Sequence, residues 1–138
     1  MTLTGAADMH PELSEAILVV DDVPSMRQVI RTCLNQLGYR NVEEARDGSE
    51  ALTMAKKKSY QWILSDWHMA PVDGPRFMEQ LQEEFGEEAP KVVFITMDGD
   101  WNVMNYAKDL GAYRLIVKPL RPSALKSSIE NVLLKTAA

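Results

Sequence analysis

The feature that most constrains this fold is a repeated alternation of short strand-like segments with longer segments of helical periodicity. The first unit opens with the apolar run 17–20, which stops at two acidic residues. Continuous apolar runs of this length are typical of strands that are buried on both faces. Apolar residues then recur at intervals of three and four from Met26 to Leu37, and Gly38 follows as a C-terminal cap. This unit is therefore predicted to be a strand followed by an amphipathic helix.

Four further units repeat the pattern along the chain. Their predicted strands are residues 41–45, 62–65, 92–95 and 115–117. Their helices are predicted to begin at a capping box over residues 47–50, after Asp73, near residue 100 and at Pro122. Strands that alternate with helices form a mainly parallel sheet, with right-handed crossovers that place helices on both faces. We expect a flavodoxin-like, doubly wound α/β fold with five parallel strands in the order 2-1-3-4-5.

Length and composition predict one domain. The chain has 138 residues, of which residues 1–14 show no period and are predicted to be a flexible tail, and residues 15–138 to form the domain. Apolar runs long enough for a membrane span and a signal-peptide pattern are absent from the sequence, so a cytoplasmic protein is expected. Cys33 is the single cysteine and is expected to be an inert core thiol. The net charge of −5 argues against nucleic-acid binding.

Three carboxylates follow two of the predicted strands. Asp21 and Asp22 end the first strand, and Asp66 ends the third. In the expected strand order these two strands are neighbours, and ligands of such folds bind at the carboxyl ends of the strands. Clustered carboxylates repel one another unless a cation or a shared proton compensates them. Because the cluster offers oxygen ligands alone, Mg²⁺ is the expected cation.

A hydroxyl and an ammonium group end the remaining strands at the same edge. Thr96 ends the fourth predicted strand and Lys118 the fifth. Each residue alone is more often a strand-end hydroxyl or a surface lysine, and Asp66 alone could cap a loop. Together they would surround a bound anion with metal, hydroxyl and ammonium, which is suited to phosphoryl transfer. Asp66 would then be the nucleophile that forms an aspartyl phosphate.

These residues and their spacing resemble the receiver domain of two-component response regulators. The resemblance covers about residues 16–134 and includes the Asp73-Gly74 and Lys118-Pro119 pairs. The segments 44–48 and Asp66-Trp67 are most similar to the CheY type of receiver, which acts in chemotaxis. The resemblance implies a single-domain signalling protein, not an enzyme in the ordinary sense, that assists its own phosphorylation and dephosphorylation.

The resemblance also implies a role for each motif residue. Asp66 would accept a phosphoryl group from a sensor histidine kinase of the CheA type. Asp21, Asp22 and Asp66 would hold Mg²⁺ together with the backbone carbonyl of His68. Lys118 would contact the phosphoryl group, Thr96 would move to hydrogen-bond it, and Pro119 would follow a cis peptide bond.

Two positions depart from the family pattern, and a third has a tuning role. Leu115 stands three residues before Lys118, where receivers commonly carry an aromatic switch residue. Tyr113 lies two residues earlier, on the same face of a strand, and is a candidate substitute. Receivers usually have a proline directly after the position of Met69, whereas this chain has Ala70 there and the proline at Pro71. His68 occupies the position that tunes dephosphorylation, and an exposed imidazole that affects water access is expected there.

The fourth helix carries a candidate partner surface. Trp101, Met104 and Lys108 recur at helical spacing on a face that the buried stripe does not use. Exposed Trp and Met side chains indicate docking, and with Leu115 and Tyr113 they form the predicted switch surface. The alternative is that Trp101 packs against its own loop.

Several outputs remain open from the sequence. The protein could bind a flagellar motor switch protein, relay phosphate to a phosphotransfer protein, serve as a phosphate sink, or be the receiver fragment of a larger regulator. It is expected to be a monomer or a weak, phosphorylation-dependent dimer, without nucleic-acid or membrane partners. An Asp-nucleophile phosphatase is disfavoured, because its nucleophile belongs to an Asp-x-Asp motif after the first strand.

Overall fold

A parallel five-stranded sheet forms the centre of the molecule. The computed structural model describes residues 11–97, 99, 101–118 and 121–135. The strands are β1 (Ile17–Val20), β2 (Val42–Ala45), β3 (Trp62–Ser65), β4 (Lys91–Thr96) and β5 (Arg114–Val117). They pair in the order β2-β1-β3-β4-β5, and all four pairings are parallel. The predicted fold class and strand order are therefore confirmed.

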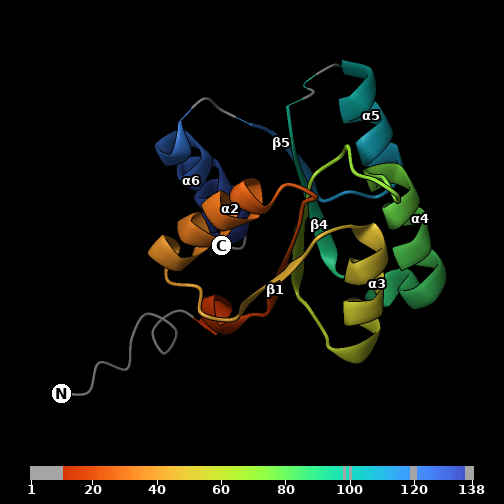
Figure 1. Cartoon of the computed structure of the whole chain (residues 1–138), viewed down its shortest axis with the longest axis horizontal. Helices are drawn as coiled ribbons and strands as arrows, with labels where there is room; N and C mark the ends of the chain where they lie inside the picture. The colour runs from red at the N-terminus through yellow and green to blue at the C-terminus, as the bar shows by residue number, and fades with distance from the viewer. Residues whose placement is uncertain (1–10, 98, 100, 119–120, 136–138) are drawn as a thin grey trace.

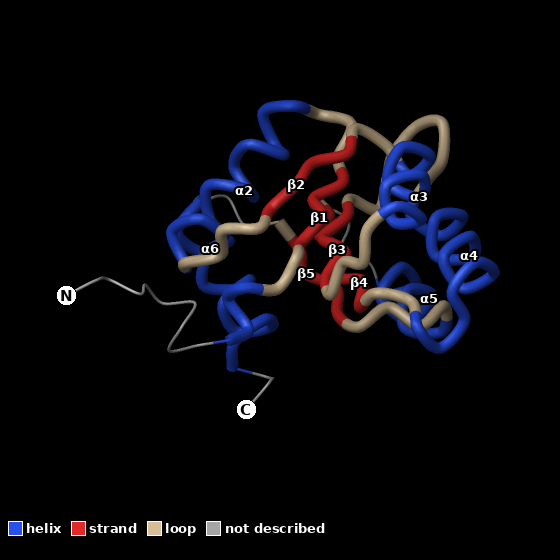
Figure 2. Tube along the Cα trace, turned by 90° about the horizontal axis from the view of Figure 1, so that it is seen from below, coloured by secondary structure: helices blue, strands red, loops and turns tan. Residues whose placement is uncertain are grey.

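Helices cover both faces of this sheet (Figures 1 and 2). They are α2 (Pro24–Leu37), α3 (Gly48–Lys57), α4 (Gly74–Phe85), α5 (Trp101–Asp109) and α6 (Pro122–Glu130), which continues into a π-helical turn, η3 (Asn131–Lys135). Helices α2 and α6 lie on one face, and α3, α4 and α5 on the other. Side chains of β1 alternate between two cores because successive residues of a strand point to opposite faces. Ile17 and Val19 join the core under α2 and α6, whereas Leu18 and Val20 join the core under α3, α4 and α5.

The helix ends have the chemistry that the sequence predicts. Gly38 ends α2 in the left-handed region, at φ 106°, which a residue with a Cβ rarely adopts. Asp47 caps α3 by accepting a hydrogen bond from the Glu50 amide at 2.8 Å, and the Glu50 carboxylate accepts one from the Arg46 amide. Asp73 caps α4 in the same way. These caps hold the loops that enter α3 and α4 in place.

The predicted N-terminal tail needs a correction. Pro11–Ser14 form a short 3₁₀ helix, η1, and Leu13 is only 3% exposed within the core under α2 and α6. A single buried leucine among polar residues has no periodicity, so the sequence pattern did not reveal this segment. Residues 1–10 lie outside the described part. Cys33 is buried, as predicted. Within the described residues, no helix is long and apolar enough to cross a membrane.

Candidate functional site

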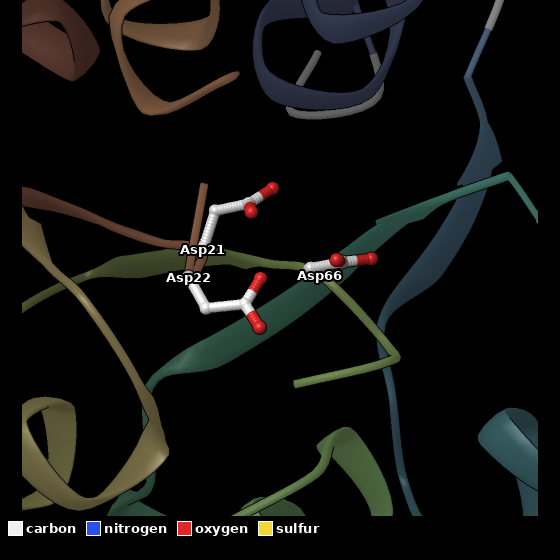
Figure 3. A group of neighbouring side chains, drawn as sticks. All are labelled: Asp21, Asp22 and Asp66. Atoms are coloured by element: carbon white, nitrogen blue, oxygen red, sulfur yellow. The ribbon is translucent and has the colours of Figure 1, made fainter. Parts of the chain in front are cut away.

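The three predicted carboxylates meet at the C-terminal edge of the sheet. Val20 of β1 pairs with Ser65 of β3, so the two strands end side by side. The Asp66 amide donates to the Val20 carbonyl at 2.9 Å and keeps the strands together one residue further. One oxygen each of Asp21, Asp22 and Asp66 lies within 4.8 Å of the others. Figure 3 shows the three side chains.

The three carboxylates differ in their access to water. Asp21 is fully buried, Asp66 is nearly so, and Asp22 is exposed. The Oδ1 atom of Asp21 accepts a hydrogen bond from the Val23 amide at 2.9 Å. Its Oδ2 atom is buried without a hydrogen-bond partner among the described residues. Burial raises the pKa of Asp21, the Val23 hydrogen bond offsets part of this rise, and the nearby charge of Asp66 adds to it.

This environment fits a bound cation. Buried charges are expected to be paired or to coordinate metals. The Asp21 Oδ2 atom lacks a hydrogen bond from the described residues and has the Lys118 Nζ atom 3.6 Å away as an ion-pair partner. Lys118 brings one positive charge to three carboxylates, so its ammonium group alone does not balance them. All the donors in the cluster are hard oxygen atoms, which Mg²⁺ prefers. The residues present therefore suit the cation that the sequence predicts.

Hydrogen bonds fix the orientation of Asp66. Its Oδ1 atom accepts from the Trp67 amide at 2.8 Å and lies 3.8 Å from the Lys118 Nζ atom. Its backbone carbonyl accepts from the hydroxyl of Ser65 at 2.9 Å. One carboxylate oxygen of Asp66, Oδ1, is thus held by the chain.

Strands β4 and β5 deliver the hydroxyl and the ammonium group to the same edge. Thr96 is buried at the end of β4, and its carbonyl accepts from the Lys118 amide at 2.7 Å. The Lys118 Nζ atom lies 3.6 Å from Asp21 and 3.8 Å from Asp66, and this side chain is 14% exposed. The ammonium group therefore counters two of the three carboxylates. Pro119 and the peptide bond before it lie outside the described residues.

Arg27 is a neighbour of the site that the sequence reading missed. Its Nη1 atom donates to the Asp21 backbone carbonyl at 2.7 Å, and its Nε atom donates to Glu44 at 3.1 Å. Arg27 lies in the first turn of α2, one turn after the acidic pair. This closeness in the sequence is the one feature that could have predicted its contact with the site. The contact ties the end of β1 to α2 and to β2.

The loop after Asp66 is tightly packed. His68 is exposed, as predicted, and the Ala70–Pro71 peptide bond is cis. The Gly74 amide donates to the Trp67 carbonyl at 2.8 Å. A Cβ atom at Gly74 would lie 2.9 Å from the Phe94 ring and 3.0 Å from the Trp67 carbonyl oxygen. Only a glycine fits this close approach of α4 to the loop.

The predicted switch surface is partly changed by the structure. Trp101 is 72% exposed, and Met104 and Lys108 are also exposed, so Trp101 is not buried against its own loop. A groove of about 400 Å³ lies between α5 and β5, and half-buried Leu115 lines it with Met104 and Lys108.

Tyr113 does not occupy the switch position. Thr96 pairs with Val117 in the β4–β5 register, and the Tyr113 amide bonds to the Val92 carbonyl near the opposite end of β4. The Tyr113 ring packs edge-on against Trp62, with centroids 5.2 Å apart. Tyr113 is four residues before Val117, the partner of Thr96, so it lies far from Thr96 along the strand even though it is on the same face as Leu115. Tyr113 lines the groove between α5 and β5, and its role as a substitute for the aromatic residue stays a prediction.

Comparison with known proteins gives consistent matches over most of the chain. The family model described as the response regulator receiver domain matches residues 17–130. The chemotaxis protein CheY-3 of Vibrio cholerae is 30% identical over 116 residues, which cover 84% of this chain and 89% of that protein. A chemotaxis protein CheY homolog of Campylobacter jejuni is 32% identical over 118 residues, or 85% of this chain and 91% of that protein. The solved structure of the chemotaxis response regulator CheY4 of Vibrio cholerae has a TM-score of 0.77 and 31% identity, covering 87% of this chain and 99% of that one.

Proposed function

Because this chain belongs to the response regulator receiver domain family, we propose that it is a phosphorylation-controlled signalling protein whose phospho-acceptor is Asp66. The observation that carries the proposal is the meeting of three carboxylates within 4.8 Å of one another beside the Lys118 ammonium group. An acceptor for a phosphoryl group needs a nucleophilic oxygen, a site for a cation, and a fixed positive charge, and this edge of the sheet offers all three.

The proposed reaction is transfer from a phosphohistidine of a sensor kinase. The Asp66 Oδ2 atom attacks phosphorus, a P–O bond forms, and the P–N bond to the imidazole breaks. The departing imidazole nitrogen keeps the bonding electron pair and takes up a proton. Lys118 contacts the phosphoryl oxygens, and the Thr96 hydroxyl donates to one of them. A Mg²⁺ ion held by Asp21, Asp22 and Asp66, with the His68 carbonyl as a further ligand, would neutralise charge on the phosphoryl group.

Dephosphorylation of Asp66 would take place at the same site. Water attacks phosphorus of the acyl phosphate and the P–O bond to Asp66 breaks. The electron pair of that bond restores the carboxylate, and inorganic phosphate leaves with the oxygen of the water, whose protons pass to the phosphate and to solvent. His68 is exposed beside the site and would tune how readily water reaches it. The protein would act in the cytoplasm, where a sensor kinase of the CheA type would supply its phosphoryl group.

The similarity to chemotaxis proteins supports a CheY-like output through protein binding. The surface of Trp101, Met104, Lys108 and Leu115 would contact a partner such as a flagellar motor switch protein. A phosphotransfer protein is the second candidate partner, in which case the chain would be a relay or a phosphate sink. Association of two copies would be weak and dependent on phosphorylation.

Intact-mass measurement with acetyl phosphate and Mg²⁺ tests the acceptor. Wild-type protein is expected to gain the mass of one phosphoryl group, and Asp66→Asn is expected to gain none. Asp73→Asn is the matched control, because Asn keeps the N-cap of α4 while removing a carboxylate from the same loop. A chelator should abolish labelling of the wild type. Equal labelling of wild type and Asp66→Asn would refute the assignment.

A further inference from the structure

Trp67 connects the carboxylate pocket to helix α5. Its amide donates to Asp66 Oδ1 at 2.8 Å, so its backbone is tied directly to the proposed acceptor. Trp67 is 5% exposed, and its ring makes two edge-on contacts. One is with Phe94 of β4, with centroids 4.9 Å apart at 85°, and the other is with Tyr106 of α5, with centroids 5.8 Å apart at 81°. A change at Asp66 therefore has a short packed route to α5.

Helix α5 has few other anchors. Within Trp101–Asp109, all of whose residues have a described burial, Ala107 is the one fully buried side chain. Val103 is half-buried, and Trp101 and Met104 are exposed. Tyr106 is 49% exposed, with its ring against Trp67. The Tyr106 ring thus joins α5 to the loop that follows the acceptor, and it lies on the helix that carries the proposed partner surface.

The alternative route through β5 lacks an aromatic ring. Leu115 stands at the position where receivers commonly carry one, and Tyr113 packs on Trp62 away from Thr96. Strand β5, Arg114–Val117, contains no aromatic ring that could follow a movement of Thr96. The contact between Trp67 and Tyr106 offers a second path from the same acceptor.

We propose that Tyr106 is the residue that transmits the state of Asp66 to the partner surface on α5. The coupling rests on the proposed phosphorylation of Asp66. Once Oδ2 carries a phosphoryl group, Oδ1 is the carbonyl oxygen of an acyl phosphate and no longer part of a carboxylate. Its hydrogen bond from the Trp67 amide loses charge assistance and weakens. The Trp67 ring then shifts against Tyr106, and α5 follows with Trp101 and Met104.

Hydrogen–deuterium exchange of peptides from α5, measured with and without acetyl phosphate and Mg²⁺, tests this coupling. Intact mass in the same samples reports labelling of Asp66. Wild type and the control Asn105→Ala, an exposed neighbour on the same helix, are expected to label and to change their exchange in α5. Tyr106→Phe keeps the ring and should behave likewise. Tyr106→Ala should label to the same extent, while its α5 response falls roughly 2- to 10-fold, the contribution of one aromatic pair.

The outcomes separate the coupling from the phosphorylation itself. A labelled Tyr106→Ala protein with a wild-type response in α5 would overturn the coupling and leave the acceptor assignment standing. Loss of labelling in Tyr106→Ala alone, or a wild-type α5 that does not respond to labelling, would also overturn it. A wild type that does not label overturns the proposed function and the coupling together. Tyr106→Leu fills the space without a ring and gives the same test if the alanine variant does not fold.

Discussion

Removing the charge of Asp21 should stabilise the protein in the absence of Mg²⁺. Asp21 is fully buried, its Oδ2 atom has no hydrogen bond from the described residues, and two other carboxylates lie close by. Asn at this position keeps an oxygen that can accept from the Val23 amide, as the Asp21 Oδ1 atom does now. The substitution Asp21→Asn therefore removes repulsion and charge desolvation with little change in shape.

Opposing electrostatic terms set the size of this gain. The oxygens of Asp22 and Asp66 lie within 4.8 Å of Asp21. With an effective dielectric constant of about 20, each repulsion at that distance costs about 3 kcal/mol. The Lys118 ammonium group lies 3.6 Å away, and its attraction offsets about 5 kcal/mol on the same scale. Solvent screens the exposed Asp22, but burial of the Asp21 charge adds a cost on the order of several kcal/mol. We expect a net gain of about 1–3 kcal/mol in the free energy of unfolding.

Urea unfolding followed by circular dichroism measures this gain, with chelator and with saturating Mg²⁺. The pKa of Asp21 is raised in the folded protein from its ordinary 3.8. A raised pKa means that the folded state binds the proton more tightly, so wild-type stability is lost as the pH rises through that pKa. Wild type and Asp21→Asn should therefore have equal stability below about pH 3.8, and the variant's advantage should grow toward neutral pH. Saturating Mg²⁺ should reduce the advantage, because it stabilises the wild-type site more.

The exposed Asp22 supplies the comparison. Asp22→Asn removes one repulsion from the cluster but leaves the buried Asp21 carboxylate charged, so its gain should be smaller. An Asp21→Asn protein that is less stable than wild type in chelator at neutral pH would refute the reasoning. An advantage that is independent of pH would refute it as well, since the effect would then not come from ionisation of Asp21.

Two further predictions concern the packing around the site and the edge strand β2. Gly74→Ala should lower the free energy of unfolding by about 1–3 kcal/mol, because its Cβ atom would clash with the Phe94 ring and the Trp67 backbone; unchanged urea midpoints would contradict this. Tyr60 donates to Glu43 at 2.9 Å, and burial first, with this hydrogen bond second, raises its pKa to about 12. Ultraviolet titration should show ionisation of Tyr60 near pH 12. The contribution of its hydrogen bond to the free energy of unfolding should be complete below about pH 10 and should be lost as the pH rises through 12. Tyr60→Phe should cost about 1 kcal/mol at neutral pH, and a normal titration of Tyr60 would contradict the assignment.

The convergence of the site was predictable because it depends on strand ends. Asp66 follows an apolar run, and Lys118 follows another, so both were expected at the C-terminal edge of one sheet. Parallel pairing then brings these ends together without any detail of side-chain packing. The caps at Gly38 and Asp47 were predictable for a similar reason, since each depends on a few consecutive residues.

Sequence patterns were less able to predict which side chains are buried. Asp21 and Asp22 are adjacent and chemically identical, yet the first is fully buried and the second exposed. The difference arises because the chain leaves β1 between the neighbouring strands and turns into α2, and periodicity does not describe such a turn. Leu13 was missed for the same reason, since its burial depends on segments far away in the chain.

The sequence by itself determined the order of elements, the strand ends, and the set of oxygen and ammonium groups at one edge of the sheet. These properties follow from local periodicity, from caps, and from the geometry of parallel strands. The tertiary structure decided which neighbours those groups have. It placed Tyr113 beside Trp62 instead of Thr96, through the β4–β5 register, and it placed Tyr106 against Trp67, through the packing of α5. Contacts between residues that are distant in the chain depend on the relative placement of whole elements, which no local pattern records.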